Sequence, residues 1–307
     1  MNPAARARFG VACAILACAA WGFAFVGPLI LDAWPANTVA AGRYIAYGLW
    51  SLLALIVMRA RGVSQPMDLK TWAAALPLTL GGNLLYYVLM SIALQRAGAL
   101  ITTLIIGLLP VTVSITGRLR ARQSLTRHYA VALLLIGVGL WLADRPPPGS
   151  TAGTDTLGLI CVTAALALWT VYAHLNSDWL RAHPRMGGVQ WSSMQGAGAL
   201  PFALALFGAA PHVPAGQGWG AFIAVSVALG VITSWAANTA WNLASTRVDT
   251  SLLGQLFVFE TIAGIAYAAL WSRMLPSLGA LAGAALLIAG VIIAMRERAP
   301  HAASAAI

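Results

Sequence analysis

Long apolar runs follow one another along this chain, and most are separated by only a few residues. Each is close to the length of about 20 apolar residues that a membrane-spanning helix needs. Their short connections predict that consecutive helices are antiparallel neighbours. The sequence therefore predicts an all-α integral membrane protein with ten transmembrane helices. The predicted spans are 9–31, 36–58, 71–94, 97–118, 128–143, 156–177, 187–210, 219–243, 250–272 and 275–295.

The composition excludes the other broad classes of protein. Of the 307 residues, 60% are hydrophobic and 8% are charged, whereas soluble domains are about 25% charged and disordered chains are poor in apolar residues. The net charge of +10 comes from short loops, which is typical of membrane topology signals and not of a nucleic-acid interface. The single lysine, Lys70, has no phosphate-binding glycine loop around it, which argues against ATP-driven work by this chain.

The basic residues also predict an orientation. If the N-terminus is cytoplasmic, the predicted cytoplasmic segments carry fourteen of the 18 Lys and Arg residues. The other side carries only Arg43, Arg96, Arg145 and Arg273. Because cytoplasmic loops are enriched in Lys and Arg, the sequence predicts a multi-pass protein of the plasma membrane, the inner membrane of a bacterium, with both termini in the cytoplasm.

A stretch rich in proline divides the chain into two parts. Residues 146–155 contain Pro146-Pro147-Pro148-Gly149 and are interpreted as a linker. Residues 1–145 then form a first five-span repeat, and residues 156–307 form a second one with a short cytoplasmic tail. Because five is odd, the second repeat must be inverted in the membrane relative to the first. Inverted repeats around a central cavity are typical of secondary transporters.

Polar and aromatic positions recur between the two predicted repeats. An offset of 148 aligns Trp21 with Trp169, and an offset of 151 aligns the third span with the eighth. The second offset pairs Asn83 with Ser234, Tyr87 with Asn238, Met90 with Trp241 and Arg96 with Arg247. This correspondence supports the division into two related halves.

Two polar stripes mark candidate substrate-binding residues. They are Asn83, Tyr86 and Tyr87 in the third span and Asn238, Trp241 and Asn242 in the eighth. Each stripe follows one helical face, and an amide that faced lipid would lack a hydrogen-bond partner. The stripes either join helices by hydrogen bonds or line a shared cavity. Their occurrence in corresponding spans favours the cavity.

Further candidates lie in the middle of other spans. Trp21 in the first span, and Trp169 with Tyr172 in the sixth, either pack within the bundle or line the cavity. Arg43 lies near the outer end of the second span, where snorkelling to water is favoured over contact with a substrate carboxylate. Glu260 lies near the centre of the ninth span, where an acid costs about 2.5–3.5 kcal/mol on insertion scales. It either couples protons, binds a substrate amine, or is a neutral structural acid.

Prolines and glycines within the spans are candidates for gating. Pro28 and Pro110 each free a backbone carbonyl, and Gly81-Gly82 permits bending or close approach beside the Asn83 stripe. The three cysteines have no metal-ligand spacing, and no nucleophile–base signature is present. We therefore expect no catalytic residues, no metal site and no cofactor.

An ordered set of motifs resembles a known family. The motifs are Ala20-Trp21-Gly22-x-x-Phe25, Leu108-Leu109-Pro110-Val111, Gly137-Val138-Gly139 and Gly290-Val291. They resemble the EamA-type, ten-span branch of the drug/metabolite transporter superfamily. Leu168-Trp169-x-x-Tyr172 and Ala240-Trp241-Asn242 are similar to the YddG-type aromatic amino-acid exporters. The resemblance implies a basket of ten helices around a cavity lined by the first, third, fourth, sixth, eighth and ninth spans.

The expected function is export of small metabolites by alternating access, with neutral and aromatic amino acids as the favoured substrates. Tyrosine, tryptophan and asparagine side chains around a cavity suit an apolar ring and a zwitterionic head group. Export of drugs or of purine and nucleoside metabolites is the alternative, and an intramembrane enzyme, a channel or a scaffold is less favoured. The expected partners are a small-molecule substrate and the lipid bilayer, not nucleic acid, and the chain is expected to act as a monomer.

Overall fold

The computed structural model describes residues 3–120, 122, 126–143, 155–209, 218–248, 253, 256–273 and 277–296. Every regular element in these ranges is a helix, which confirms the all-α prediction. Six helical segments in the described ranges are long and apolar enough to cross a membrane, and three more are shorter and apolar. The six are Ala4–Ile30, Ala36–Ala60, Leu69–Arg96, Ile101–Arg120, Thr156–Ala182 and Trp219–Ser245.

Each predicted span overlaps a helical segment of the structure. The first half contains α1 (Pro3–Gly22), α2 (Gly27–Ile30), α3 (Ala36–Ala60), α4 (Leu69–Thr79), α5 (Tyr86–Arg96), α6 (Ala99–Ile106), α7 (Leu109–Arg120) and α8 (Arg127–Ala143). The second half contains α9 (Thr156–Ala182), α10 (Gly188–Gly208), α11 (Trp219–Ala228), α12 (Ala237–Ser245), α14 (Val258–Ser272) and α15 (Leu278–Arg296). The predicted linker, except Asp155, and most of 250–257 lie outside the described residues. Ten crossings and an inverted repeat stay predictions.

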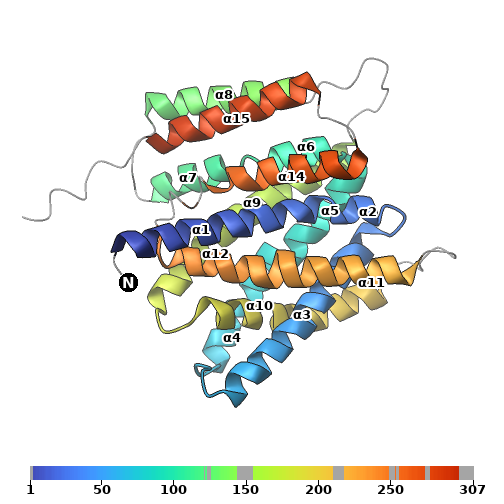
Figure 1. Ribbon diagram of the computed structural model, residues 1–307, viewed down its shortest axis with the longest axis vertical. Coiled ribbons are helices and arrows are strands. Elements are labelled where there is room, and N and C mark those ends of the chain that lie inside the picture. Colours follow the sequence, from blue (N-terminus) through green and yellow to red (C-terminus); the bar gives the residue numbers. More distant parts are fainter. Residues whose placement is uncertain are drawn as a thin grey trace, which may run out of the picture.

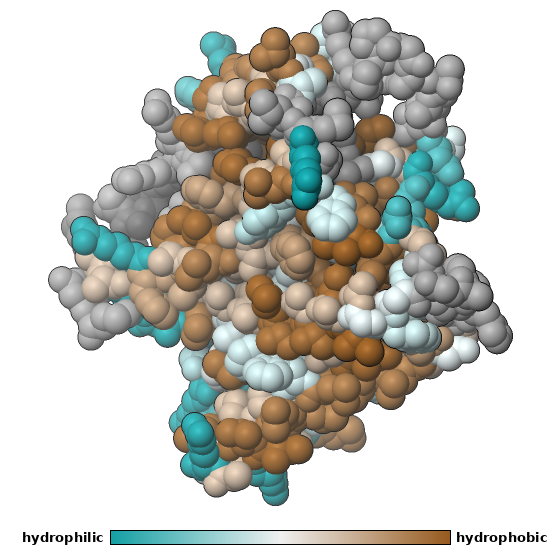
Figure 2. Space-filling view, turned by 45° about the vertical axis from the view of Figure 1, so that its right-hand side comes forward, coloured by the Kyte–Doolittle hydropathy of each residue, from teal (hydrophilic) through white to brown (hydrophobic). Residues whose placement is uncertain are grey.

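The surface of the bundle is largely apolar. Leu16, Ile56 and Leu134 are each about two-thirds exposed, although leucine and isoleucine are ordinarily buried in soluble proteins. Figure 2 shows hydrophobic residues over the middle of one face and most hydrophilic residues toward its margins. This surface fits a chain whose helices contact lipid.

Helices from the two halves pair with each other across the bundle. α3 packs along α10, and α8 packs along α15 (Figure 1). α1 packs against α12 and α14 of the second half, whereas α9 packs against α5, α6 and α7 of the first half. The first helix of each predicted half therefore contacts the third and fourth spans of the other half.

Four of the central spans are interrupted. A 3-10 turn, η1 (Phe23–Phe25), separates α1 from α2, and a turn at Gly107 and Leu108 separates α6 from α7. Pro28 and Pro110 lie in the first turns of α2 and α7, where a missing N–H is tolerated. The third and eighth spans instead contain π-helical segments, η2 (Leu80–Leu85) and η3 (Leu229–Ala236). Such segments are rare and frequently occur at functional sites.

One polar contact joins the end of α5 to the start of α9. Asp155 caps α9 by accepting the Leu157 N–H at 2.8 Å, and it accepts a hydrogen bond from Arg96 Nη1 at 2.8 Å. The Arg96 guanidinium and the Leu157 N–H hold the pKa of Asp155 below its usual value. A carboxyl group whose pKa is lowered by folding stabilises the folded state when the pH is above its unfolded-state pKa. This contribution is lost as the pH falls through the folded-state pKa.

We therefore expect Asp155→Asn to lower the thermal unfolding midpoint at neutral pH. The deficit relative to the wild type should shrink below about pH 4, where the unfolded carboxyl binds a proton. Thermal scans between pH 3 and pH 8 would measure this, and Asp32→Asn, which changes another exposed acid, is the matched control. A deficit that is the same at every pH would contradict the ionic explanation.

Candidate functional site

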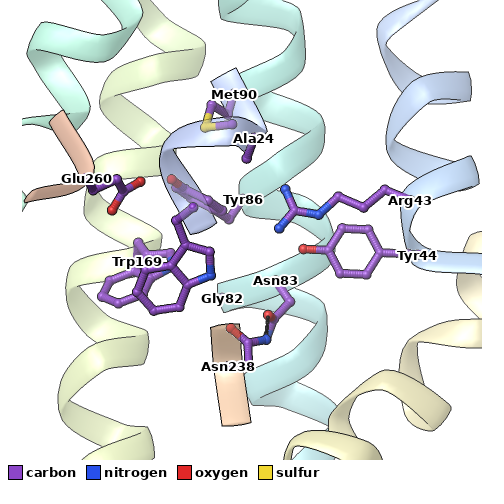
Figure 3. A pocket seen from close by; sticks show the side chains of 11 residues that line it. Ala24, Arg43, Tyr44, Gly82, Asn83, Tyr86, Met90, Trp169, Asn238 and Glu260 are labelled. Carbon is purple, nitrogen blue, oxygen red and sulfur yellow. Dashed lines mark hydrogen bonds between the residues drawn. The ribbon is translucent and has the colours of Figure 1, made fainter. Parts of the chain in front are cut away.

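A small central pocket brings residues of both halves together (Figure 3). Its volume is about 20 Å³, which is enough for about one water molecule and too small for an amino acid. The lining residues are Trp21, Ala24, Arg43, Tyr44, Gly82, Asn83, Tyr86, Met90, Trp169, Asn238 and Glu260. The structure therefore shows this site in a conformation that is too small for an amino acid.

An acidic and a basic side chain lie on either side of the pocket. The Glu260 carboxyl group, from α14, and the Arg43 guanidinium, from α3, point toward each other in Figure 3. They are only 6% and 5% exposed, respectively. No ion pair within 4 Å joins these two described residues. The snorkelling interpretation of Arg43 is wrong, because its side chain turns into the protein interior.

The π-helical segment η3 explains the position of Arg43. Its irregular turn leaves backbone carbonyls without the usual helical N–H partner, and side chains can donate hydrogen bonds to them. Thr233 Oγ1 and Ser234 Oγ both donate to the Leu229 carbonyl. Arg43 Nε donates to Ser234 Oγ at 2.8 Å, and Nη2 donates to the Thr233 carbonyl at 3.3 Å. These bonds hold the guanidinium beside the pocket, over the Tyr87 ring at 4.0 Å.

Amide side chains form one wall of the site. Asn238 Nδ2 donates to Asn83 Oδ1 at 3.0 Å, so the two predicted stripes meet. Asn83 Nδ2 lies 3.5 Å from Gln195 Oε1 of α10, which also accepts from the Tyr172 hydroxyl at 3.1 Å. This network joins the third, sixth, seventh and eighth predicted spans.

The network continues away from the pocket along α9. Gln195 Nε2 donates to Asn176 Oδ1 at 3.0 Å, and Trp191 Nε1 donates to the same oxygen at 2.7 Å. Asn176 Nδ2 then donates to Asn242 Oδ1 at 3.0 Å. The Asn242 Nδ2 group is buried and has no partner in the described structure. A chain of amides thus runs from the pocket toward the end of α9.

Four aromatic rings pack together beside the pocket. Trp21 stacks on Phe257 at 5.9 Å between ring centroids and contacts Trp241 at 5.2 Å. Trp169 meets Phe257 edge-on at 4.7 Å and contacts Trp21 at 5.6 Å. The rings come from α1, α9, α12 and the residue before α14. Trp21 and Trp169 line the pocket together with Glu260 and Arg43, and the other two rings pack against them.

The structure brings six of the ten predicted binding residues to the pocket wall. These are Trp21, Asn83, Tyr86, Trp169, Asn238 and Glu260. The other four, Tyr87, Tyr172, Trp241 and Asn242, do not line it and instead contact residues that do, or belong to the amide chain. Their roles in binding stay predictions.

Sequence reasoning missed several contributors to the site. Tyr44 lines the pocket, and Phe257 belongs to the aromatic cluster. Gln195 links three amide or hydroxyl groups. A glutamine inside the apolar seventh span was a usable signal, because a buried amide needs a partner. Phe257 gave no such signal, since it lies in a run of ordinary apolar residues.

The predicted gating residues occupy different environments. A Cβ on Gly82 would run into the Tyr172 ring, so α9 approaches η2 closely at that glycine. A Cβ on Gly81 would meet nothing within 4 Å. Pro28 and Pro110 lie next to the breaks described above. Their part in gating, and that of the glycines, stays a prediction.

Comparisons with known proteins point to one family. Residues 8–143 match the model of the EamA-like transporter family. The inner membrane protein YtfF of Escherichia coli is 35% identical, over 94% of this chain and 95% of its own. A crystal structure that covers 94% of this chain and 96% of its own, at 18% identity, has the same fold with a TM-score of 0.70. This chain therefore belongs to the EamA-like transporter family.

Proposed function

We propose that the protein is a secondary transporter that exports neutral and aromatic amino acids. The observation that carries the proposal is that an acidic and a basic side chain, Glu260 and Arg43, face each other across the central pocket. A free amino acid carries the complementary pair, an ammonium and a carboxylate. Arginine binds carboxylates in a planar, two-bonded geometry, and a carboxylate accepts hydrogen bonds from an ammonium.

The aromatic cluster supports a preference for large apolar side chains. Trp21 and Trp169 line the pocket with Glu260 and Arg43, and Trp241 and Phe257 extend the apolar surface behind them. Aromatic rings gain about 0.5–1.5 kcal/mol from such contacts beyond the burial of their area. A substrate ring would therefore replace contacts that the cluster now makes with itself.

The small pocket must enlarge to admit an amino acid, and the fold supports a way to do so. The interruptions at η1, η2, η3 and the α6–α7 turn lie in four spans of the central bundle. α1 packs against helices of the second half, and α9 packs against helices of the first half. An inverted repeat of residues 1–145 and 156–307 would produce this arrangement. We infer alternating access by rocking of these two halves around the pocket.

The proposed setting is the bacterial inner membrane, with both termini in the cytoplasm and the chain acting as a monomer. The distribution of Lys and Arg supports the orientation. The similarity to a protein described as an inner membrane protein supports the compartment.

Uptake of labelled phenylalanine, tryptophan, leucine, methionine and threonine into proteoliposomes, with and without a pH gradient, tests the proposal. Saturable uptake that unlabelled aromatic amino acids inhibit would support it. The Asn83–Asn238 amide pair would also suit the edge of a nucleobase, so adenine and uridine are included. Uptake of these, without uptake of any amino acid by folded protein, would contradict the amino-acid assignment.

Trp169→Ala is expected to change the selectivity of the protein that still folds, although loss of this buried ring also lowers stability. Its ring contacts three of the aromatic side chains at the site, whereas a threonine substrate would gain little from it. We expect the ratio of phenylalanine to threonine uptake to fall about tenfold, which corresponds to about 1.4 kcal/mol. Trp271→Ala, which removes a half-exposed tryptophan on α14, is the matched control and should leave the ratio unchanged. An equal loss of phenylalanine uptake and threonine uptake would contradict this role.

A further inference from the structure

A second, larger cavity lies at one end of the bundle. Its volume is about 340 Å³. It is formed where α1 begins, where α12 ends and where α9 turns into α10. Figure 1 shows the start of α1 and the end of α12 at the same edge of the molecule. The cavity shares no lining residue with the central pocket.

Three arginines from different segments line this cavity. Arg6 comes from the start of α1, Arg181 from the end of α9 and Arg247 from the turn after α12. No acidic residue is among the described residues that line it. Arginine side chains from separate segments at the wall of one cavity favour an anion there.

Arg247 is held in place by hydrogen bonds, but not every N–H group of its guanidinium has a partner. Its Nη1 donates to the Leu243 carbonyl at 2.7 Å and to Thr246 Oγ1 at 3.1 Å. Its Nε–H is buried and has no hydrogen-bond partner within the described structure. The Nε–H is too deeply buried for a ligand in the cavity to reach, but Arg247 itself lines the cavity. A guanidinium group fixed at a cavity wall suits an oxyanion acceptor.

The start of α10 adds partial positive charge to the same cavity. This 21-residue helix begins at Gly188 after Gly187, whose position has no side-chain cap, and both glycines line the cavity. The first N–H groups of a helix lack partners within the helix, and with the helix dipole they favour anions. A Cβ on Gly187 would meet nothing within 4 Å, so the backbone there is open.

We propose that this cavity binds a phosphate group, from either an anionic lipid head group or a free organic phosphate. Three guanidinium groups and a helix start suit the charge and the several acceptor oxygens of phosphate. The cavity lies at the ends of apolar helices, the level at which head groups occur, and basic pockets between such helices bind anionic head groups. The site is independent of what the central pocket transports.

The first test uses the wild-type protein, purified in detergent and stripped of lipid. Thermal unfolding is followed with inorganic phosphate, glycerol phosphate or chloride at equal ionic strength, and with added phosphatidylglycerol or phosphatidylcholine. Stabilisation by the soluble phosphates but not by phosphatidylglycerol identifies a free phosphate as the ligand, and stabilisation by phosphatidylglycerol identifies a lipid. The same midpoint in all five conditions would overturn the proposal.

Variants then localise the effect. Arg247→Gln, and separately Arg6→Gln at the exposed start of α1, should weaken binding of the stabilising ligand about tenfold. Arg61→Gln, at the exposed end of α3, is the matched control and should bind like the wild type. Arg6→Gln keeps the test decisive if Arg247→Gln does not fold. Unchanged affinity in Arg6→Gln, or an equal loss in Arg61→Gln, would place the anion elsewhere and overturn the assignment.

Discussion

Replacing Glu260 by glutamine is expected to weaken binding of phenylalanine about tenfold or more, while binding of 3-phenylpropanoate stays nearly unchanged. The second compound has the same ring and carboxylate but no ammonium group. A hydrogen bond to a charged partner contributes about 1.5–3 kcal/mol, and a tenfold change in affinity is about 1.4 kcal/mol. Only a residue that contacts the ammonium should separate the two compounds.

Arg43→Gln makes the converse prediction. Phenylalanine should bind about tenfold or more weakly, whereas phenethylamine, which lacks the carboxylate, should bind nearly as it does to the wild type. Because Arg43 also holds η3 through Ser234, Ser234→Ala serves as the control for loss of that support. Inhibition of labelled phenylalanine uptake into proteoliposomes by each analogue provides the measurement.

The two variants together distinguish charge recognition from other roles. If Glu260 instead carries protons, Glu260→Gln should abolish the response to a pH gradient and affect both analogues alike. If Glu260 is a structural acid, Glu260→Gln should leave both affinities and the pH response unchanged. Either of these results would contradict recognition of a zwitterion by Glu260.

The helical segments themselves were predictable from the sequence because membrane helices require long apolar runs. The burial of the two polar stripes was predictable for a related reason, since amides such as Asn83 and Asn238 avoid lipid. Both are among the buried residues of the structure. These inferences need only the sequence of one helix at a time.

The position of Arg43 was not predictable in this way. Near a span end, water is the usual destination of an arginine side chain. Here the π-helical segment η3 offers Ser234 Oγ and the Thr233 carbonyl to the guanidinium. A π-helical turn leaves no mark in hydropathy, and the contact joins residues 190 or more positions apart. Phe257 illustrates the same limit, because its role depends on which rings surround it.

The close contact between α3 and η3 predicts the largest effect on folding. A Cβ on Gly230 would lie 2.6 Å from the Tyr47 nitrogen, 2.7 Å from the Arg43 carbonyl oxygen and 2.6 Å from the Ala46 Cβ. Two of these atoms are backbone, so a rotamer change cannot relieve the clash. Overpacking of this kind costs about 1–3 kcal/mol and occasionally more.

We therefore expect Gly230→Ala to lower the thermal unfolding midpoint and the yield of monodisperse protein. Gly81→Ala is a matched control, because Gly81 lies in the other π-helical segment and a Cβ there meets nothing within 4 Å. Its midpoint should stay the same or rise, since glycine within a helix costs about 0.5–1 kcal/mol relative to alanine. Because displacement of α3 would also move Arg43, the Gly230→Ala protein that does fold should bind phenylalanine more weakly. Equal midpoints for the two variants would show that α3 and η3 can separate without cost, which would contradict a fixed Arg43 at the pocket.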